Sequence, residues 1–175
     1  QAPPRTKRCG ARRNSIPLPP MDQPNYITPE GLAALRARYD FLFADERPKL
    51  VEVVSWAAGN GDRSENGDYL YGKKRLREID RELGWLSRRM KAARAVNPAE
   101  QPDKSRIWFG ATVTIADEDD RERILTLVGD DEQNASVGRV GWNSPIARAL
   151  RGAAVGDLRR VTLPGGEIEY EVIRI

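Results

Sequence analysis

The chain has 175 residues, enough for one ordinary hydrophobic core or two small ones, and no run of about 18 apolar residues such as a membrane span needs. Charged residues make up 31% and aromatic residues 7%, which favours a charged helical arm joined to a modest globular unit over one large dry core. A single cysteine, Cys9, and the lack of histidine exclude a disulfide framework and a Cys/His metal site within the chain. We therefore expect a cytoplasmic protein with two small domains.

The net charge of +3 comes from the first 20 residues. Five bases and no acid lie there, which leaves 24 of the 29 bases against all 26 acids in residues 21–175. This tail is rich in proline and lacks the apolar segment of a secretory signal. We expect residues 1–20 to be a disordered basic extension, or sequence upstream of a natural start at Met21. A basic arm that binds nucleic acid is the alternative.

Residues 21–97 are predicted to form an antiparallel coiled-coil hairpin of two long helices. Thr28 and Pro29 supply a capping hydroxyl and a proline suited to the first helical turn. Pro48 is expected to bend the first helix without ending it, because the apolar stripe continues beyond it. The glycines of GNGDRS mark the turn, with Ser64 as the cap of the second helix and the tip at residues 59–69. Apolar residues recur at steps of three and four along both arms, at Leu32, Leu35, Tyr39, Leu42, Leu50, Val53 and Ala57, then at Tyr69, Leu76, Ile79, Leu83, Leu86 and Met90.

A second domain is predicted over residues 106–175, after a polar, proline-containing linker at 98–105. Alternation in WFGATVTI, ERILTLV and EIEYEVIRI indicates a small antiparallel β-sheet. Ser144 and Pro145 open one short helix that Gly152 closes. The expected fold class is α+β.

Three acids crowd the predicted tip: Asp62, Glu65 and Asp68. Acids in the first turn of a helix complement its dipole and cap free amides, which is a sufficient structural explanation. A cap needs only one acid, however, and carboxylates at the end of a projecting hairpin could help hold a Mg²⁺ ion that keeps positions open for water and phosphate. Both interpretations stand at this point.

The second helix carries a basic stripe. Lys73, Lys74, Arg77, Arg81 and Arg88 fall within about a 100° sector, roughly opposite the apolar stripe. Charged outer faces are normal on coiled coils but are mostly of mixed sign. A stripe of one sign beside an acidic tip suggests a nucleic-acid backbone running along the helix.

One long segment matches a known family. The run SWAAGNGDRSENGDYLYGKKRLREIDREL resembles the tip signature of the Gre family of transcript-cleavage, or transcription elongation, factors, in its GreB branch. ERP near residue 47, FGATV near 110, SPIARAL near 145 and VGD near 156 resemble the family in the same order, so the resemblance covers residues 25–175.

The resemblance implies a partner and a mechanism. In this family the coiled coil enters the secondary channel of bacterial RNA polymerase, and an FKBP-like globular domain docks outside on its rim. The positions of Asp62 and Glu65 match the catalytic acidic pair, which holds a second Mg²⁺ jointly with the polymerase and positions the attacking water. The chain would be an accessory factor and not an enzyme, a monomer with no metal or membrane of its own, that stimulates cleavage of the 3′ RNA in backtracked complexes. The same matching assigns RNA contacts to Lys73, Lys74, Arg77 and Arg81, and support of the tip to Asn66, Asp68 and Tyr69.

Three glycines depart from the family pattern. Gly67 stands where the family most often has alanine, and Gly72 and Gly84 interrupt the second helix at about 1 kcal/mol each relative to alanine. These residues predict a tip that is more mobile than usual.

Other functions remain open at this stage. A regulator of the same architecture could block the polymerase channel without stimulating cleavage, although both tip acids are retained. A prolyl isomerase would need an aromatic-lined pocket, whereas Trp142 and Tyr170 are the only aromatic residues after Gly110. A coiled-coil adaptor without chemistry is the third alternative.

Overall fold

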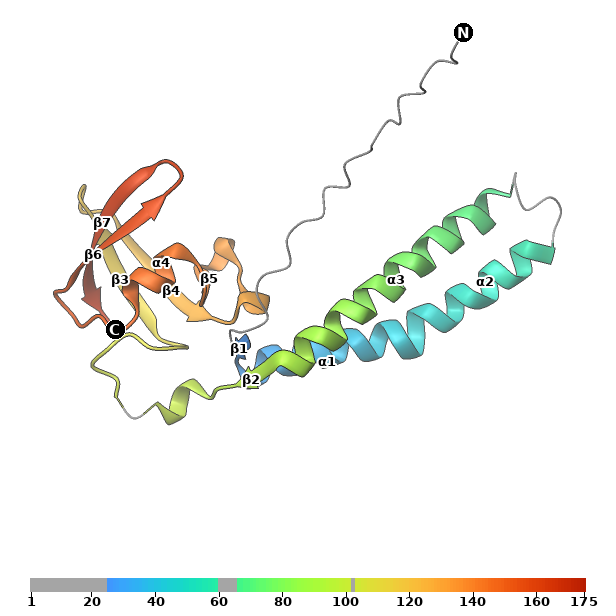
Figure 1. Cartoon of the computed structure of the whole chain (residues 1–175), viewed down its shortest axis with the longest axis horizontal. Coiled ribbons are helices and arrows are strands. Elements are labelled where there is room, and N and C mark those ends of the chain that lie inside the picture. Colours follow the sequence, from blue (N-terminus) through green and yellow to red (C-terminus); the bar gives the residue numbers. More distant parts are fainter. Residues whose placement is uncertain (1–24, 60–65, 102) are drawn as a thin grey trace, which may run out of the picture.

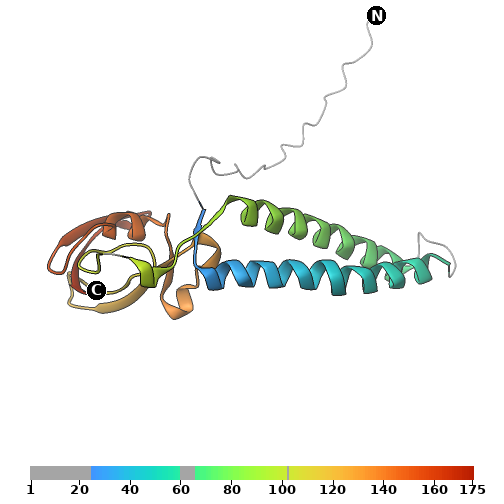
Figure 2. The ribbon, with the colours of Figure 1, turned by 90° about the horizontal axis from the view of Figure 1, so that it is seen from below.

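A hairpin of two long helices projects from a small β-sheet domain, and Figures 1 and 2 show it from two directions. The computed structural model describes residues 25–59, 66–101 and 103–175. The predicted extension at 1–20, the acids Asp62 and Glu65, and Ser64 therefore lie outside the described residues. The predicted α+β class, with the helical hairpin first and the β-sheet domain second, is confirmed.

The first arm of the hairpin passes through Pro48 without ending, as the sequence predicts. It consists of α1 (Pro29–Phe41), a π-helical segment (Leu42–Glu46) and α2 (Arg47–Gly59). Proline has no N–H to donate to the carbonyl four residues earlier, which disturbs the ordinary ladder at this point. Just before the proline, the Arg47 N–H donates to the Leu42 carbonyl, five residues back. The wider π-helical turn thus carries the helix across the proline.

The second arm, α3 (Gly67–Ala92), is a single helix of 26 residues. Its cap is Asn66, whose side chain accepts a hydrogen bond from the Tyr69 N–H. The prediction that Ser64 caps this helix is therefore wrong. The reason is that both residue types are good caps, and the choice between two candidates two residues apart depends on contacts with the other arm.

The core of the hairpin is thin. Leu42, Ile79, Leu83 and Leu86 are buried, and a few partly buried side chains surround them. Gly72 is also buried, and a Cβ atom placed on it would lie 2.4 Å from Val54 Cγ2. Gly72 therefore does more than weaken the helix, because its missing side chain lets α2 and α3 approach closely.

A short parallel pair of strands closes the base of the hairpin. β1 (Asn25–Ile27) pairs with β2 (Ala93–Ala95), so that the residues before α1 and those after α3 lie side by side. Ile27 is fully buried. Strands of three residues carry too little alternation to be predicted from sequence. They fix the two ends of the hairpin at the β-sheet domain.

The β-sheet domain contains a curled five-stranded sheet in the order β5-β4-β3-β7-β6. The pairs β3–β4, β3–β7 and β6–β7 are antiparallel, as expected, but β4–β5 is parallel, so the sheet is mixed. Two short 3₁₀ turns between β4 and β5 reverse the chain twice, which lets β5 run in the same direction as β4. The strands are β3 (Thr112–Asp117), β4 (Glu122–Val128), β5 (Arg139–Gly141), β6 (Leu158–Leu163) and β7 (Gly166–Arg174), and the turns are Asp130–Glu132 and Ala135–Val137.

The predicted short helix of this domain is present as α4 (Pro145–Leu150). Ser144 caps it by accepting a hydrogen bond from the Ala147 N–H at 3.3 Å. Ala147 and Leu150 face the sheet and are fully buried with side chains of β3, β4, β6 and β7. The chain between the hairpin and the sheet contains one 3₁₀ turn, Pro98–Glu100. The exact domain boundaries stay a prediction.

Candidate functional site: the free end and outer face of the hairpin

Asn66 joins the two arms at the end of the hairpin that lies far from the β-sheet domain. Its Oδ1 accepts the Tyr69 N–H at 3.2 Å and so caps α3. Its Nδ2 donates to the carbonyl of Ala57, near the end of α2, at 2.9 Å. One amide side chain thus satisfies a free donor of one helix and a free acceptor of the other. The sequence predicted that Asn66 supports the tip, but the bond to Ala57 could not be predicted from it.

Tyr69 and Lys73 form a second contact near this end. Lys73 Nζ donates to Tyr69 Oη at 3.3 Å and lies 5.2 Å from the centre of the tyrosine ring. The residues are four apart on α3, so they lie on the same side of the helix. Asp68 is exposed in the first turn of α3, where its charge complements the positive end of the helix dipole. Lys73, predicted to contact RNA, is thus also held by the tip itself.

Most acidic side chains of α3 are paired with arginines, whereas most of its basic side chains have no ion-pair partner among the described residues. Beyond its first turn, each acidic side chain of this helix takes part in an ion pair, two of them with the opposite arm. Arg75 also reaches the opposite arm, where it pairs with Glu46 at 2.6 Å. The three acids and their partners are Glu78 with Arg75 at 3.4 Å, Asp80 with Arg47 at 2.9 Å, and Glu82 with Arg38 at 2.8 Å.

These pairs hold the two arms in register. The hydrogen bonds that Arg75 donates to Glu46 raise the pKa of Arg75, and those that Arg38 donates to Glu82 raise the pKa of Arg38. Both guanidinium groups therefore remain charged at any pH the protein meets. Each pair is partly exposed to water and contributes little stability by itself. Their main effect on the surface is that Glu78, Asp80 and Glu82 each lie next to an arginine.

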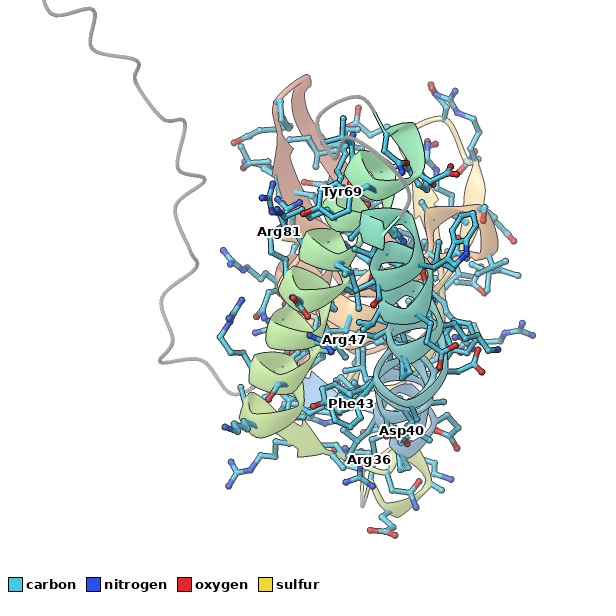
Figure 3. All side chains as sticks on the ribbon, turned by 90° about the vertical axis from the view of Figure 1, so that its right-hand side faces the viewer. Arg36, Asp40, Phe43, Arg47, Tyr69 and Arg81 are labelled. Atoms are coloured by element: carbon cyan, nitrogen blue, oxygen red, sulfur yellow. The ribbon has the colours of Figure 1, made fainter. Side chains whose placement is uncertain are left out.

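The predicted basic stripe remains on that outer face. Within the described residues its members take part in no ion pair, and all of them are exposed: Lys73, Lys74, Arg77, Arg81 and Arg88. Figure 3, which looks at the free end of the hairpin, shows Arg81 directed away from the other arm, whereas Arg47 lies between the arms. The outer face of α3 is therefore positively charged, as the sequence predicts.

The base of α3 is fixed to the β-sheet domain. Arg89 Nε donates to both carboxylate oxygens of Asp131, at 2.7 and 2.9 Å, and Arg89 Nη2 donates to Asn25 Oδ1 at 2.7 Å. Asn25 Nδ2 in turn donates to Asp131 at 2.9 Å. The Asp131 side chain is only 4% exposed, so its carboxylate in this charge-assisted contact is well shielded from solvent. No pattern in the sequence indicated this contact, because the residues are far apart in the chain.

The candidate catalytic acids cannot be placed beside these groups, since Asp62 and Glu65 lie outside the described residues. In sequence they stand between Gly59, the last residue of α2, and Asn66. Within the described ranges, no three His, Cys, Asp or Glu side chains are grouped so that they could hold a metal ion. In that same part of the chain no helix has the length and apolar character needed to cross a membrane.

Comparisons with known proteins cover both domains. Residues 25–95 match the family described as "Transcription elongation factor, N-terminal", and residues 101–175 match "Transcription elongation factor, GreA/GreB, C-term". The transcription elongation factor GreB of Neisseria meningitidis serogroup B (strain MC58) is 46% identical over 151 residues, which are 86% of this chain and 93% of that protein. GreB of Yersinia pestis is 43% identical over 155 residues, 89% of this chain and 90% of that protein.

Solved structures show a weaker likeness. The GreA factor homolog 1 (Gfh1) of Thermus thermophilus is 18% identical and covers 86% of this chain and 97% of its own, with a TM-score of 0.41. The assignment to a family therefore rests on the sequence matches.

Proposed function

Because the chain belongs to the GreA/GreB family of transcription elongation factors, we propose that it binds bacterial RNA polymerase through the secondary channel and stimulates cleavage of backtracked RNA. The polymerase performs the hydrolysis, and this chain is an accessory factor. Its hairpin enters the channel while the β-sheet domain remains outside. Cleavage removes the displaced 3′ segment of the RNA and leaves a new 3′ end in the active site.

The observation that carries this proposal is the combination of a narrow hairpin with a positively charged outer face. α3 has 26 residues, which at 1.5 Å per residue gives an arm about 39 Å long. Its core is a single layer of buried side chains, so the hairpin is slender enough to be inserted into another molecule. The acids of α3 are drawn into ion pairs, and five exposed bases are left along the face that would meet RNA.

The apolar residues of the hairpin support a monomer. Leu42 of the first arm packs with Ile79, Leu83 and Leu86 of the second, and all four are buried within one chain. The apolar seam that these four residues form is thus covered within one chain. A cytoplasmic location follows from the proposed partner.

Asp62 and Glu65 are proposed to supply the chemistry at the tip. Two carboxylates offer the oxygen donors that Mg²⁺ prefers, and this pair would complete the coordination of an ion that the polymerase also holds. When bound, that ion would lower the pKa of a coordinated water and so supply the nucleophile. The isolated chain is proposed to hold no metal by itself.

Other side chains of the chain have positioning roles in this proposal. Asn66 joins α2 to α3 through its side chain and directly follows Glu65 in the sequence. It therefore fixes the position at which the segment containing Asp62 and Glu65 meets α3. Lys74, Arg77 and Arg81 neutralise phosphates of the displaced RNA, and Lys73 does so from its place against Tyr69.

A stalled elongation complex tests the proposal. RNA polymerase is halted on a template so that it backtracks, with the RNA labelled at its 5′ end, and the full chain is added in the presence of Mg²⁺. The expected result is a shorter labelled RNA that the polymerase can extend when nucleotides are supplied. A chain that binds the polymerase and competes with another channel ligand, but leaves the RNA at full length, would instead be a regulator without cleavage stimulation.

A further inference from the structure

Two exposed aromatic residues lie on the positive face of α3. Tyr71 is 71% exposed and Trp85 is 44% exposed. Large aromatic side chains left in water have no role in the core, and the buried residues of this helix are Gly72, Ile79, Leu83 and Leu86. In the part of the chain that the structure describes, neither ring stacks on another ring or on a cation.

The two rings belong to one stripe with three bases. Residues at alternating steps of three and four share one face of a helix, as in the buried seam of a coiled coil, but this stripe points outward. We call it the outer stripe, and its members in order are Tyr71, Lys74, Glu78, Arg81, Trp85 and Arg88. Each aromatic residue is followed by a basic residue within one helical turn.

The outer stripe contains one acid, and that acid has a partner. Glu78 lies 3.4 Å from Arg75, which is itself bonded to Glu46 of the opposite arm. Lys74, Arg81 and Arg88 have no ion-pair partner among the described residues. The outer stripe therefore presents two aromatic rings, each next to a positive charge without an ion-pair partner in the described part of the chain, and one paired acid between them.

We propose that Tyr71 and Trp85 stack on bases of the displaced single-stranded RNA, while Lys74, Arg81 and Arg88 neutralise its phosphates. This inference rests on the proposed function and adds the residues that stack on the RNA bases. Single strands are bound without strict sequence preference by this combination, because every base has a π-face and every nucleotide has a phosphate. The rings are separated by 14 residues of helix, about 21 Å, so they engage two different bases of one strand.

A protein surface is a less suitable occupant for this stripe. The centre of a protein–protein interface is enriched in tyrosine, tryptophan and arginine but depleted of lysine and glutamate, whereas Lys74 and Glu78 both lie between the two rings of the outer stripe. Aromatic and basic side chains on one helix face instead match single-stranded RNA, in which each nucleotide has a flat base and a charged phosphate.

Binding of RNA by the full chain and its variants tests the proposal. The probe is a fluorescently labelled 12-nucleotide single-stranded RNA, and anisotropy is followed over a series of salt concentrations. The variants are Tyr71→Leu, Trp85→Leu, Trp85→Phe and Arg81→Gln. Trp108→Leu is the matched control, because Trp108 is 42% exposed but lies in the β-sheet domain. Circular dichroism checks that each variant is folded.

Loss of an aromatic ring should lower the RNA affinity, whereas loss of a basic side chain should also change the salt dependence of that affinity. Tyr71→Leu and Trp85→Leu should each weaken binding by at least about fivefold, since stacking contributes at least about 1 kcal/mol per base. Neither should change the slope of log affinity against log salt, because that slope counts phosphate contacts. Trp85→Phe should retain most of the affinity, and Arg81→Gln should make the slope shallower by about 0.7. Trp108→Leu should bind like the parent.

Several results would overturn the inference. Parental RNA affinity in both leucine variants would do so, as would a parent chain that binds no RNA at low salt. If the leucine variants bind RNA normally but lose affinity for RNA polymerase, the rings contact protein and the proposal is wrong. Cleavage assays on the same proteins keep the two proposals separate. A parent that binds RNA through these rings without stimulating cleavage would refute the proposed function and leave the stacking in place.

Discussion

Glu132 of the β-sheet domain accepts hydrogen bonds from both the backbone N–H and the hydroxyl of Thr28, the residue that caps α1. The Thr28 N–H donates to Glu132 Oε2 at 2.9 Å, and the Thr28 hydroxyl donates to Glu132 Oε1 at 2.5 Å. The Gly129 N–H also donates to Oε2, at 3.2 Å. Gly31 permits this approach, because a Cβ atom there would lie 2.3 Å from Glu132 Cδ. One carboxylate thus fixes the start of the hairpin against the β-sheet domain.

Glu132→Gln should weaken this junction. A glutamine keeps the shape but has one acceptor oxygen, so it cannot receive all three hydrogen bonds, and hydrogen bonds to a charged group are worth about 1.5–3 kcal/mol. We expect the free energy of unfolding to fall by about 1–3 kcal/mol, measured by urea denaturation. Glu118→Gln is the matched control, since Glu118 is exposed on the same domain. Equal stability of the two variants would show that the clamp contributes nothing.

Gly72→Ala and Gly84→Ala should change stability in opposite directions. Alanine favours a helix over glycine by about 1 kcal/mol, and at position 84 the new Cβ meets only Arg88 Nη1 at 3.6 Å. At position 72 it would lie 2.4 Å from Val54 Cγ2, on a β-branched side chain with few alternative rotamers. We expect thermal unfolding to show a higher Tm for Gly84→Ala and a lower Tm for Gly72→Ala. A higher Tm in both would mean that the arms separate at no cost.

Asn66 variants should separate capping from the bond between the arms. Asn66→Ser keeps a good capping oxygen but cannot reach the Ala57 carbonyl, whereas Asn66→Ala loses both functions. The alanine variant should lose about 1 kcal/mol of stability and the serine variant less. Both should stimulate cleavage several-fold more slowly at saturating concentration, because the acidic segment is no longer anchored. Full cleavage activity of Asn66→Ser would mean that the cap alone is sufficient.

Replacing three exposed bases, Lys74, Arg77 and Arg81, by glutamine should lower the salt dependence of cleavage stimulation. Each lost phosphate contact on a single strand reduces the slope of log activity against log salt by about 0.7. Arg75→Gln is the control in the same helix, because Arg75 is engaged with Glu46 and Glu78. That control should change stability slightly and leave the slope unchanged. A triple variant with the parental slope would show that the stripe is only a solvated face.

Asp62→Asn and Glu65→Gln should separate binding from chemistry. Each change keeps the size of the side chain but removes a negative charge from the proposed Mg²⁺ site. The variants should occupy the polymerase as well as the parent does and lose most of the cleavage stimulation. Raising the Mg²⁺ concentration should restore part of the rate, since the missing charge mainly weakens metal retention. The measurement is cleavage rate against Mg²⁺, with polymerase binding followed in parallel.

The opposite results have clear meanings. Full activity of either variant at low Mg²⁺ would contradict the proposed chemistry. A loss of polymerase binding equal to the loss of rate would return Asp62 and Glu65 to a structural role.

The sequence by itself determined the two arms, the basic stripe and the short helix of the β-sheet domain. Each of these is local: the stripe at Ile79, Leu83 and Leu86 repeats with the period of a helix, and Thr28 and Ser144 cap helices whose first turns follow directly. The same periodicity placed Arg77 and Arg81 opposite the apolar seam. Local pattern is sufficient wherever neighbours in space are neighbours within a few residues in the chain.

Only the tertiary structure decided which charges are free. The helical period leaves Arg75 out of the basic stripe but does not identify its partner Glu46, 29 residues earlier, whereas Arg77 is exposed and has no ion pair among the described residues. The junction of Glu132 with Thr28, 104 residues apart, has the same character. So does the choice of Asn66 as cap, which depends on the carbonyl of Ala57 in the opposite arm. Hydrogen bonds and ion pairs form over about 3 Å, and which groups come within that distance depends on how the arms and the β-sheet domain pack together.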